Sequence, residues 1–581
     1  MHPMPPHPKG TRARVLLSSV FGPYAQDDEY GSRAANPMEL YQNQVTRVQG
    51  GFSLRMFHRS FALLMLQANI EAPCTVLDFP SRKRFVEELQ NQPYDIIGIS
   101  AIIPNIEKVK AMCRLIRRHQ PHATIVVGGH VANYPDLEQA IDTDHIVRGD
   151  GIAWLRQFLG QSLDAPVKHP EATSAFSTRI LGIDLPDKPG DTAAILIPSV
   201  GCPVGCNFCA TSALFGGKGK FINFYETGDE LFDVMCRLEK TLKVRSFFVL
   251  DENFLLHRRR ALRLLELMQA RQKSWMLNVF SSARVLRSYT MEQLVGLGIG
   301  WVWMGIEGKN SRYRKLEDVD THGLVKRLQS HGIRVLGSSI IGMEHHTPGT
   351  IDQVIAHAVS HGTDFHQFML YTPVPGTPLY EAHKENGTLL SEAEMPPADA
   401  HGQYRFNYRH AHIKAGQEEG FLLRAFKRDF RENGPSLARL IRTLLTGWQR
   451  YKTHPDPRLR ARYAWEVAPL RTTYAGAVWA MKQYYRDTPH LFRKMTCLLS
   501  DIYREFGWTT RLAAPVIGLY AYLRLLREEQ RLTKGWRYEP TTFYEKNPAA
   551  QALHKRPKPF RLPLQGTAGA PLVPPEPALK Q

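Results

Sequence analysis

The sequence lacks the features that would make it an integral membrane or secreted protein. It contains no apolar run of the roughly 20 residues that a membrane-spanning helix needs. The nearest candidate, 512–526, is interrupted by Pro515 and Arg524, which favours a buried or interfacial helix. The first eight residues have no continuous apolar core, so we expect no signal peptide.

Cysteine is also scarce, with seven residues in 581. This is too few and too scattered for a disulfide framework, so we expect a reducing, cytoplasmic location in which thiolates are free to bind metal. Four cysteines are isolated and are expected to be core or near-surface thiols: Cys74, Cys113, Cys236 and Cys497.

The other three cysteines stand together as Cys202, Cys206 and Cys209, directly after an apolar segment. Three residues separate the first pair and two separate the second. This spacing suits three thiolates on one corner of a cubane iron–sulfur cluster, which leaves the fourth iron without a protein ligand. An open iron favours catalysis over a structural role. The alternatives are zinc, which usually takes four protein ligands, or coincidence.

Positive charge is concentrated in the last third of the chain. The formal net charge is +19, and residues 401–581 contain 32 Lys and Arg against 14 Asp and Glu, a net of +18. The first 400 residues are therefore nearly neutral, and a property of the C-terminal segment should explain the excess. Its many Trp and Tyr residues leave three alternatives: nucleic-acid binding, an anionic membrane surface, or an ordinary helical lid with a solvated face.

Apolar and amphipathic segments alternate up to about residue 390. The first series predicts strands at 15–20, 74–78, 94–100, 123–129 and 145–148, and helices at 53–70, 82–90, 107–119 and 136–141. The second series predicts strands at 194–198, 246–250, 277–281, 301–305, 335–341 and 366–371, and helices at 228–240, 258–272, 290–297, 321–332 and 350–361. We therefore expect an α/β protein with a doubly wound parallel sheet followed by a partial (β/α)6 barrel.

The same pattern divides the chain into five segments. We expect a sheet domain at 1–160, a polar linker at 161–191 and the barrel at 192–390. A basic, mainly α-helical domain follows at 391–556, and the Pro-rich residues 557–581 are expected to be disordered. Ligands of parallel sheets lie at the carboxyl ends of the strands, so we expect the functional residues there.

The three cysteines, with the aromatic Phe208 before the last of them, resemble the radical S-adenosylmethionine superfamily. The resemblance implies that Cys202, Cys206 and Cys209 hold a [4Fe–4S] cluster. It further implies that the open iron binds the amino and carboxylate groups of S-adenosylmethionine. One electron then cleaves the sulfonium and yields a 5′-deoxyadenosyl radical, which a water-poor barrel would protect.

The resemblance extends through the second α/β series. Asp251 and Glu252 stand where the superfamily places an acidic segment beneath the substrate ammonium, although Gly-Gly-Glu itself is absent and a helix-start cap is the alternative. Other residues match by position: Arg284 as a carboxylate-binding arginine or a surface arginine, Glu307 as a ribose or methionine contact, and Gly337 and Gly342 as glycines of the strand along adenine. The segment 371–378 resembles a closing segment of the cobalamin-linked branch, or is a plain turn.

The N-terminal series resembles the cobalamin-binding domain of that branch. The residues placed to meet the cofactor are Ser100, Gly128, Gly129, His130 and Gly149. Glycine at such positions lets the backbone approach a bulky ligand. The Asp-x-His-x-x-Gly motif is absent, so a bound cobalamin would lack that histidine as its lower ligand. The alternatives are a loop histidine at His130 and a sheet domain that has lost its cofactor.

The resemblance implies a cobalamin-dependent enzyme that methylates an unactivated carbon of a small molecule or lipid. Ring closure or rearrangement on the same architecture is one alternative. RNA modification is another, but methylthiolating RNA enzymes of the superfamily need a second three-cysteine cluster, which is absent here. The expected partners are an external one-electron donor, a small-molecule or lipid substrate and, peripherally, an anionic membrane, with nucleic acid less favoured.

Overall fold

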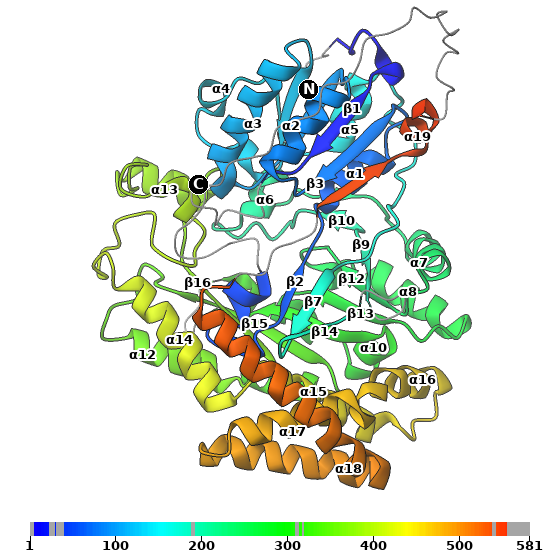
Figure 1. The fold of residues 1–581 in the computed structure, drawn as a ribbon, viewed down its shortest axis with the longest axis vertical. Coiled ribbons are helices and arrows are strands. Elements are labelled where there is room, and N and C mark those ends of the chain that lie inside the picture. The colour runs from blue at the N-terminus through cyan, green and yellow to red at the C-terminus, as the bar shows by residue number, and fades with distance from the viewer. Residues whose placement is uncertain are drawn as a thin grey trace, which may run out of the picture.

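The computed structural model describes residues 5–21, 30, 40–186, 192–307, 313–316, 319–536 and 542–554. Figure 1 shows an α/β unit at one end of the molecule, a second sheet in the middle and a group of helices at the other end. The tail expected at 557–581 lies outside the described residues, as does the last part of the expected linker.

The N-terminal sheet has the expected parallel core. Its strands are β1 (Val15–Ser18), β3 (Cys74–Asp78), β4 (Ile96–Ser100), β5 (Thr124–Gly128) and β6 (His145–Val147), in the order β3-β1-β4-β5-β6. The helices are α1 (Phe61–Ala68), α2 (Arg82–Asn91), α3 (Ile106–His119), α4 (Leu137–Ala140) and α5 (Gly151–Phe158). Every residue of β1 and β3 is buried, as continuous apolar strands covered on both faces require.

Two local expectations are wrong in this region. The helix expected at 53–70 begins only at Phe61, because β2 (Arg55–Phe57) occupies the preceding residues. The segment expected as a linker contains β7 (Phe176–Ile180) and β8 (Ile183–Asp184), and β2, β7 and β8 form a small antiparallel sheet. The Phe57 and Phe176 rings pack 5.8 Å apart, so a contact between distant segments selects the strand conformation.

The central sheet contains all six strands that the sequence predicts between residues 194 and 371. Its six parallel strands are β9 (Ala194–Leu196), β12 (Ser246–Val249), β13 (Met276–Phe280), β14 (Ile299–Gly305), β15 (Arg334–Ile341) and β16 (Phe365–Leu370), which lie side by side in chain order. Its helices are α7 (Gly228–Leu242), α8 (Arg258–Ala270), α9 (Ala283–Arg287), α10 (Met291–Gly296), α11 (Thr321–Ser330), α12 (Ile351–Ser360) and α13 (Pro378–Glu385). Parallel strands place all their carboxyl ends at one edge, where the site is expected.

The C-terminal region is helical, with α14 (Glu418–Asn433), α15 (Ser436–Tyr451), α16 (Pro457–Glu466), α17 (Thr473–Tyr484) and α18 (Pro489–Thr533), which breaks at Gly507. Some of its arginines have structural partners. Arg462 donates to the carbonyls of Val295 and Ile299, and its partner Glu466 also accepts from Arg334. Some of the arginines that make this region basic therefore contact the amino-terminal ends of barrel strands.

A last strand returns to the N-terminal sheet. β17 (Phe543–Lys546) pairs antiparallel with β3 and is followed by α19 (Pro548–His554). The strand was not predicted, because its partner lies more than 450 residues earlier in the chain. Among the described residues, none of the helices combines the length and apolarity that crossing a bilayer requires.

Candidate active site and cofactor cavity

The three cysteines lie on a loop between β10 (Ser199–Val200) and α6 (Ala210–Leu214). The loop turns back sharply at Gly205, whose φ is +63° and where a Cβ atom would lie 2.5 Å from the Lys218 backbone. The Cys209 amide donates to the Cys206 carbonyl at 3.0 Å, and its sulfur accepts from the Ser212 amide at the start of α6. All three cysteines are half-buried in this loop.

The environment of the thiols suits a cationic cluster. Burial, with smaller contributions from the neighbouring Cys209, Cys206 and Glu252, raises the pKa of Cys202 to about 11. Burial likewise raises the pKa of Cys206. Bound iron stabilises thiolates through its positive charge, which offsets this cost of burial. The donor set and its surroundings therefore fit an iron–sulfur cluster held by three protein ligands.

An acid and a lysine that was not predicted lie beside the cysteine loop. Glu307, at the end of β14, has a left-handed φ of +52° and is buried. Its Oε1 is 2.5 Å from the Lys315 ammonium, and its buried Oε2 has no hydrogen-bond partner. The ammonium lies 5.2 Å from the centre of the Phe208 ring. Burial lowers the pKa of Lys315, but Glu307 and Cys206 outweigh that effect and raise it.

Asp251 and Glu252 follow β12 and have different surroundings. The Asp251 carboxylate is buried and accepts from Arg260 at 2.7 Å and from Ser199 at 2.5 Å, so it already has a cation and a hydroxyl partner. Glu252 has a buried Oε2 without a hydrogen-bond partner, and burial raises its pKa to about 7. Of the two predicted acids, Glu252 is therefore the one with a carboxyl oxygen left for a ligand.

The remaining predicted residues of the barrel lie in different kinds of element. Arg284 is exposed on α9, which packs against the segment containing Lys315. Gly337 lies within β15, where a Cβ atom would be 2.5 Å from Ile306. At Gly342, with φ +76°, a Cβ atom would be 2.2 Å from Phe406. Close packing thus explains why glycine stands at both positions, and their contact with adenine stays a prediction.

A cavity of about 510 Å³ lies between the N-terminal sheet and the part of the barrel that contains β10 and α6, the two elements that flank the cysteine loop. Six predicted residues line it: Ser100, Gly128, Gly129, His130, Gly149 and Glu252. Gly129 has φ +83°, and a Cβ atom there would be 2.7 Å from the Ala101 carbonyl. Burial lowers the pKa of His130, which keeps its imidazole neutral near pH 7.

The opposite wall of the cavity comes from α6, which follows Cys209 directly, and from the ends of β9 and β12. Most of this wall is apolar, including Leu214, Phe215, Ile197 and Leu250. One space therefore connects the carboxyl edge of the N-terminal sheet with the end of the barrel. Its glycine-rich floor and apolar walls fit a large, mostly apolar cofactor such as a corrinoid. Lys315 and this apolar wall had no recognisable sequence signal.

Comparison with protein families and curated proteins agrees with this arrangement. Residues 54–159 match the B12 binding domain family. An uncharacterised methyltransferase of Pyrococcus horikoshii is 23% identical over 51% of this chain and 71% of its own length. The bacteriochlorophyllide d C-12(1)-methyltransferase of Chlorobaculum tepidum is 28% identical over 33% of this chain and 42% of its own. An anaerobic magnesium-protoporphyrin IX monomethyl ester cyclase of Cereibacter sphaeroides is 25% identical over 52% and 55%.

Among solved structures, the radical S-adenosylmethionine methyltransferase TsrM from Kitasatospora setae, with cobalamin and a [4Fe–4S] cluster bound, matches 78% of this chain and 98% of its own. The TM-score is 0.48 and the identity 15%. This chain spans only about half the length of two of the three curated relatives. The cobalamin-binding part of the resemblance drawn from the sequence is confirmed by the match of residues 54–159 to the B12 binding domain family. The chain is also similar to curated proteins named as methyltransferases.

Proposed function

We propose that this protein is a cobalamin-dependent radical S-adenosylmethionine enzyme that methylates an unactivated carbon of a small molecule or lipid. The observation that carries the proposal is the cavity, which has the N-terminal sheet on one side and Glu252 and α6, the helix that directly follows Cys209, on the other. Two cofactors must approach one substrate in such a reaction, and this cavity brings their expected sites together. Curated relatives named as methyltransferases support the proposal.

Each group of residues has a separate task in this proposal. Cys202, Cys206 and Cys209 would hold the cluster, which supplies the electron that cleaves S-adenosylmethionine, while cobalamin supplies the methyl group. Glu307, fixed by Lys315, lies beside the cysteine loop and suits the ribose or methionine part of S-adenosylmethionine. The apolar cavity walls exclude water, which protects reactive species from solvent. An external donor must deliver the electron.

A ring-closing reaction is the second candidate. One curated relative is named as a cyclase, and it matches about as much of this chain as the first methyltransferase does. Both reactions can begin with abstraction of a hydrogen atom from the substrate. Product analysis separates them, because methylation adds one carbon to the substrate and ring closure adds none.

The test is anaerobic reconstitution of the full chain with iron, sulfide and hydroxocobalamin. We expect a [4Fe–4S] absorbance, a corrinoid spectrum that survives desalting, and release of 5′-deoxyadenosine on reduction. Cys206→Ala should abolish the cluster and the cleavage, whereas Cys497→Ala, at an exposed cysteine far along the chain, should change neither. Release of 5′-deoxyadenosine by Cys206→Ala, or loss of all corrinoid on desalting, would contradict the proposal.

We further propose a cytoplasmic location with peripheral contact at an anionic membrane. Several C-terminal arginines that could have served nucleic acid have intramolecular partners instead, such as Arg439 with Asp429 and Arg462 with Glu466. These intramolecular ion pairs make an RNA substrate the less favoured alternative.

A further inference from the structure

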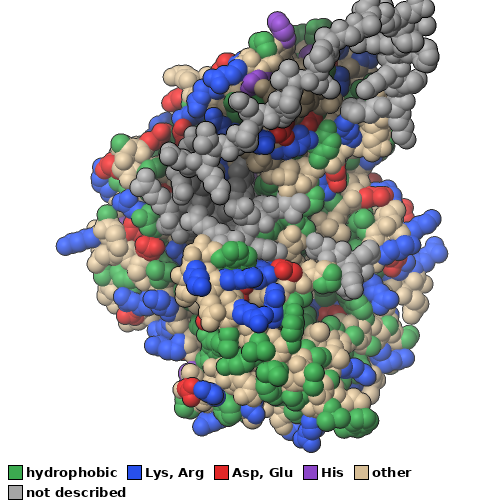
Figure 2. Space-filling model, viewed as in Figure 1, with side chains coloured by type: hydrophobic (Ala, Val, Ile, Leu, Met, Phe, Trp, Pro, Cys, Tyr) green, Lys and Arg blue, Asp and Glu red, His purple; other side chains and the backbone are tan. Residues whose placement is uncertain are grey.

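The second half of α18 has large apolar side chains on its exposed face. Six of them follow one another at helical spacing and are between 49% and 73% exposed: Trp508, Leu512, Val516, Leu519, Tyr520 and Leu523. We call this set the α18 stripe. Among the described residues, five other large apolar side chains are exposed, and only one of them, Leu163 at 54%, is as exposed as the members of the stripe. Figure 2 shows apolar side chains gathered at the end of the molecule where Figure 1 places α17 and α18.

Packing within the chain accounts for the other face of this helix. Thr510, Ala514, Gly518, Ala521 and Leu525 are buried. Gly518 lies so close to α17 that a Cβ atom would be 2.6 Å from the Trp479 ring. A helix at the edge of a domain normally has a polar outer face. The α18 stripe therefore needs an explanation outside this fold.

The charge around the stripe is positive. Residues 506–526 contain no Asp or Glu, and their two charged residues are Arg511 and Arg524. The acids that follow are held within the fold: Glu528 pairs with Arg179, and Glu529 accepts from Tyr484. Arg504, Arg511 and Arg527 are exposed near the stripe. The outward face therefore combines apolar side chains with cations.

We infer that the α18 stripe docks on the surface of an anionic lipid bilayer. An interfacial helix places its apolar side chains at the headgroup boundary and its basic side chains against lipid phosphates, and Trp and Tyr favour that boundary. A second copy of the chain fits less well, because a two-fold contact of this face with itself would bring like charges together. The inference rests on the membrane contact proposed above, for which it names the helix, and does not depend on the catalytic proposal.

Flotation of the full-length protein with vesicles tests this inference. We expect binding to vesicles that contain phosphatidylglycerol and much weaker binding to pure phosphatidylcholine. Leu512→Ser with Val516→Ser should weaken binding at least about tenfold, because two exposed apolar side chains are lost. Arg511→Gln should weaken it about fivefold. Leu163→Ser, at an exposed leucine outside the stripe, is the matched control and should not affect binding.

Each of three results would overturn the inference. They are no binding to anionic vesicles, equal binding by wild type and the Leu512→Ser, Val516→Ser variant, and a stable dimer that this variant disrupts. The substituted side chains point to solvent, so thermal unfolding should be unchanged and should exclude misfolding as the cause. Protein without a cluster should bind vesicles equally well, which separates this test from the catalytic one.

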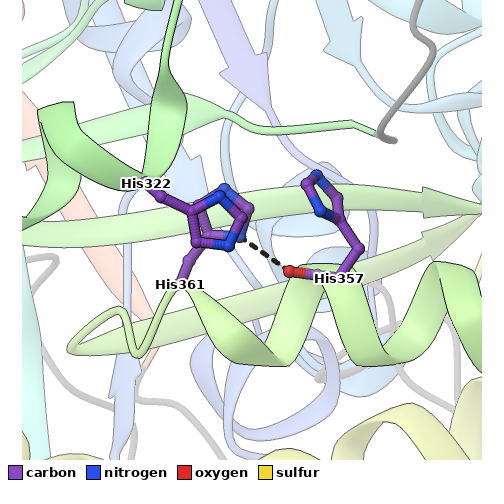
Figure 3. Close-up of side chains that lie close together, drawn as sticks. All are labelled: His322, His357 and His361. Atoms are coloured by element: carbon purple, nitrogen blue, oxygen red, sulfur yellow. Dashed lines mark hydrogen bonds between the residues drawn. The ribbon is translucent and has the colours of Figure 1, made fainter.

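A different observation carries a second proposal. His322 on α11 and His357 and His361 on α12 each have a ring nitrogen within 4.8 Å of the others (Figure 3). His357 and His361 are four residues apart and thus share one face of their helix. The His322 and His361 rings stack with their centres 3.6 Å apart. His361 Nδ1 lies 2.9 Å from the His357 carbonyl, which leaves Nε2 as its ligand atom.

The chemistry of this cluster suits a borderline transition-metal ion. Three imidazoles are a common ligand set for Zn²⁺, with water in the fourth position. Metal binding needs the neutral form of imidazole, and His361 is buried. Thr321 and Ser360 lie within hydrogen-bond distance of the two stacked rings. To bind one ion, the stacked His322 and His361 rings would have to rotate out of their stack and give up these hydroxyl contacts.

We propose that this cluster binds one Zn²⁺ ion on the outer, helical layer of the barrel. The test is titration of cluster-loaded protein with Zn²⁺ in competition with a chromogenic chelator, so that Cys202, Cys206 and Cys209 are already occupied. We expect one equivalent to bind and to raise the unfolding temperature. His322→Ala with His357→Ala should weaken this binding at least about tenfold, whereas His122→Ala, at an exposed histidine elsewhere, should not. Equal affinity in all three proteins, or binding only at millimolar Zn²⁺, would overturn the proposal.

Discussion

At the scale of single residues, Lys315 has the clearest role that the sequence did not indicate. It holds Glu307 at 2.5 Å in a buried position beside the cysteine loop. Lys315→Met would leave this carboxylate without its cation, and we expect S-adenosylmethionine affinity to fall about tenfold or more. Lys315→Arg should restore part of it. Calorimetric titration of reconstituted protein measures the affinity, and unchanged iron content would show that the cluster still assembles.

Unchanged affinity in Lys315→Met would mean that Glu307 does not need this partner. Loss of iron together with affinity would instead assign Lys315 to cluster assembly. The sequence could not reveal the pair, because Glu307 and Lys315 are joined by a segment without strand or helix periodicity. The cysteines, by contrast, were predictable because their chemistry depends on short-range spacing alone.

Glu252 gives a prediction about pH. Burial raises its pKa from an ordinary value near 4.5 to about 7. The folded protein therefore binds this proton more tightly than the unfolded chain does. The protonated Glu252 side chain thus contributes to the free energy of unfolding at low pH. This contribution is lost as pH rises from about 4.5 to 7. In protein without cofactors, Glu252→Gln should flatten this part of the stability profile. Urea unfolding at several pH values measures the effect, and an identical slope in both proteins would refute it.

At the scale of elements, the helices under the barrel depend on a buried charge network. Glu466 on α16 accepts from Arg462 at 2.6 Å and from Arg334 on β15 at 2.6 Å. Removing one member leaves buried charges uncompensated, so Glu466→Ala should reduce the free energy of unfolding by about 3–5 kcal/mol. The exposed pair of Glu394 and Arg409 is the matched control. Glu394→Ala should leave the free energy of unfolding nearly unchanged in the same urea titration, because water and salt screen an exposed pair.

Equal effects of the two substitutions would show that the network under the barrel does not stabilise the fold. The network also helps to explain the excess positive charge of the C-terminal region. From the sequence, this charge could have served nucleic-acid binding, an anionic membrane surface or an ordinary helical lid. Part of it pairs within the fold, and another part surrounds the α18 stripe. Sequence composition could not separate these uses, since an arginine that binds a buried carbonyl and one that faces solvent look alike.

Most strands and helices were predictable because their apolar patterns are local. Strands such as β4 and β9 are short, mostly apolar runs, and the six strands of the central sheet pair in chain order. β2 and β7 were missed because each becomes a strand only by pairing with the other across more than a hundred residues. Weak local preference yields to such contacts.

At the scale of the whole molecule, a strand near the C-terminus pairs with the N-terminal sheet. β17 joins the edge of the N-terminal sheet beside β3, and Arg59 contacts this strand through Glu545 at 2.8 Å and through the Phe543 ring. The C-terminal segment thus connects the helical end of the molecule to the sheet that is expected to bind cobalamin. It also covers a sheet edge that would otherwise carry unpaired backbone groups.

This arrangement gives the last prediction. Truncation after residue 536 removes β17 and α19, exposes the β3 edge and should weaken the N-terminal sheet. Truncation after residue 554 keeps both elements and is the control. We expect faster amide exchange in β3, weaker retention of hydroxocobalamin and more aggregation only for the shorter protein, because an open strand edge pairs with other chains. Cluster content should be the same in both truncations, since β17 pairs with β3 of the N-terminal sheet, whereas the three cysteines lie in the loop between β10 and α6. Equal amide exchange rates in β3 of the two truncated proteins would mean that β17 pairs with the sheet without stabilising it.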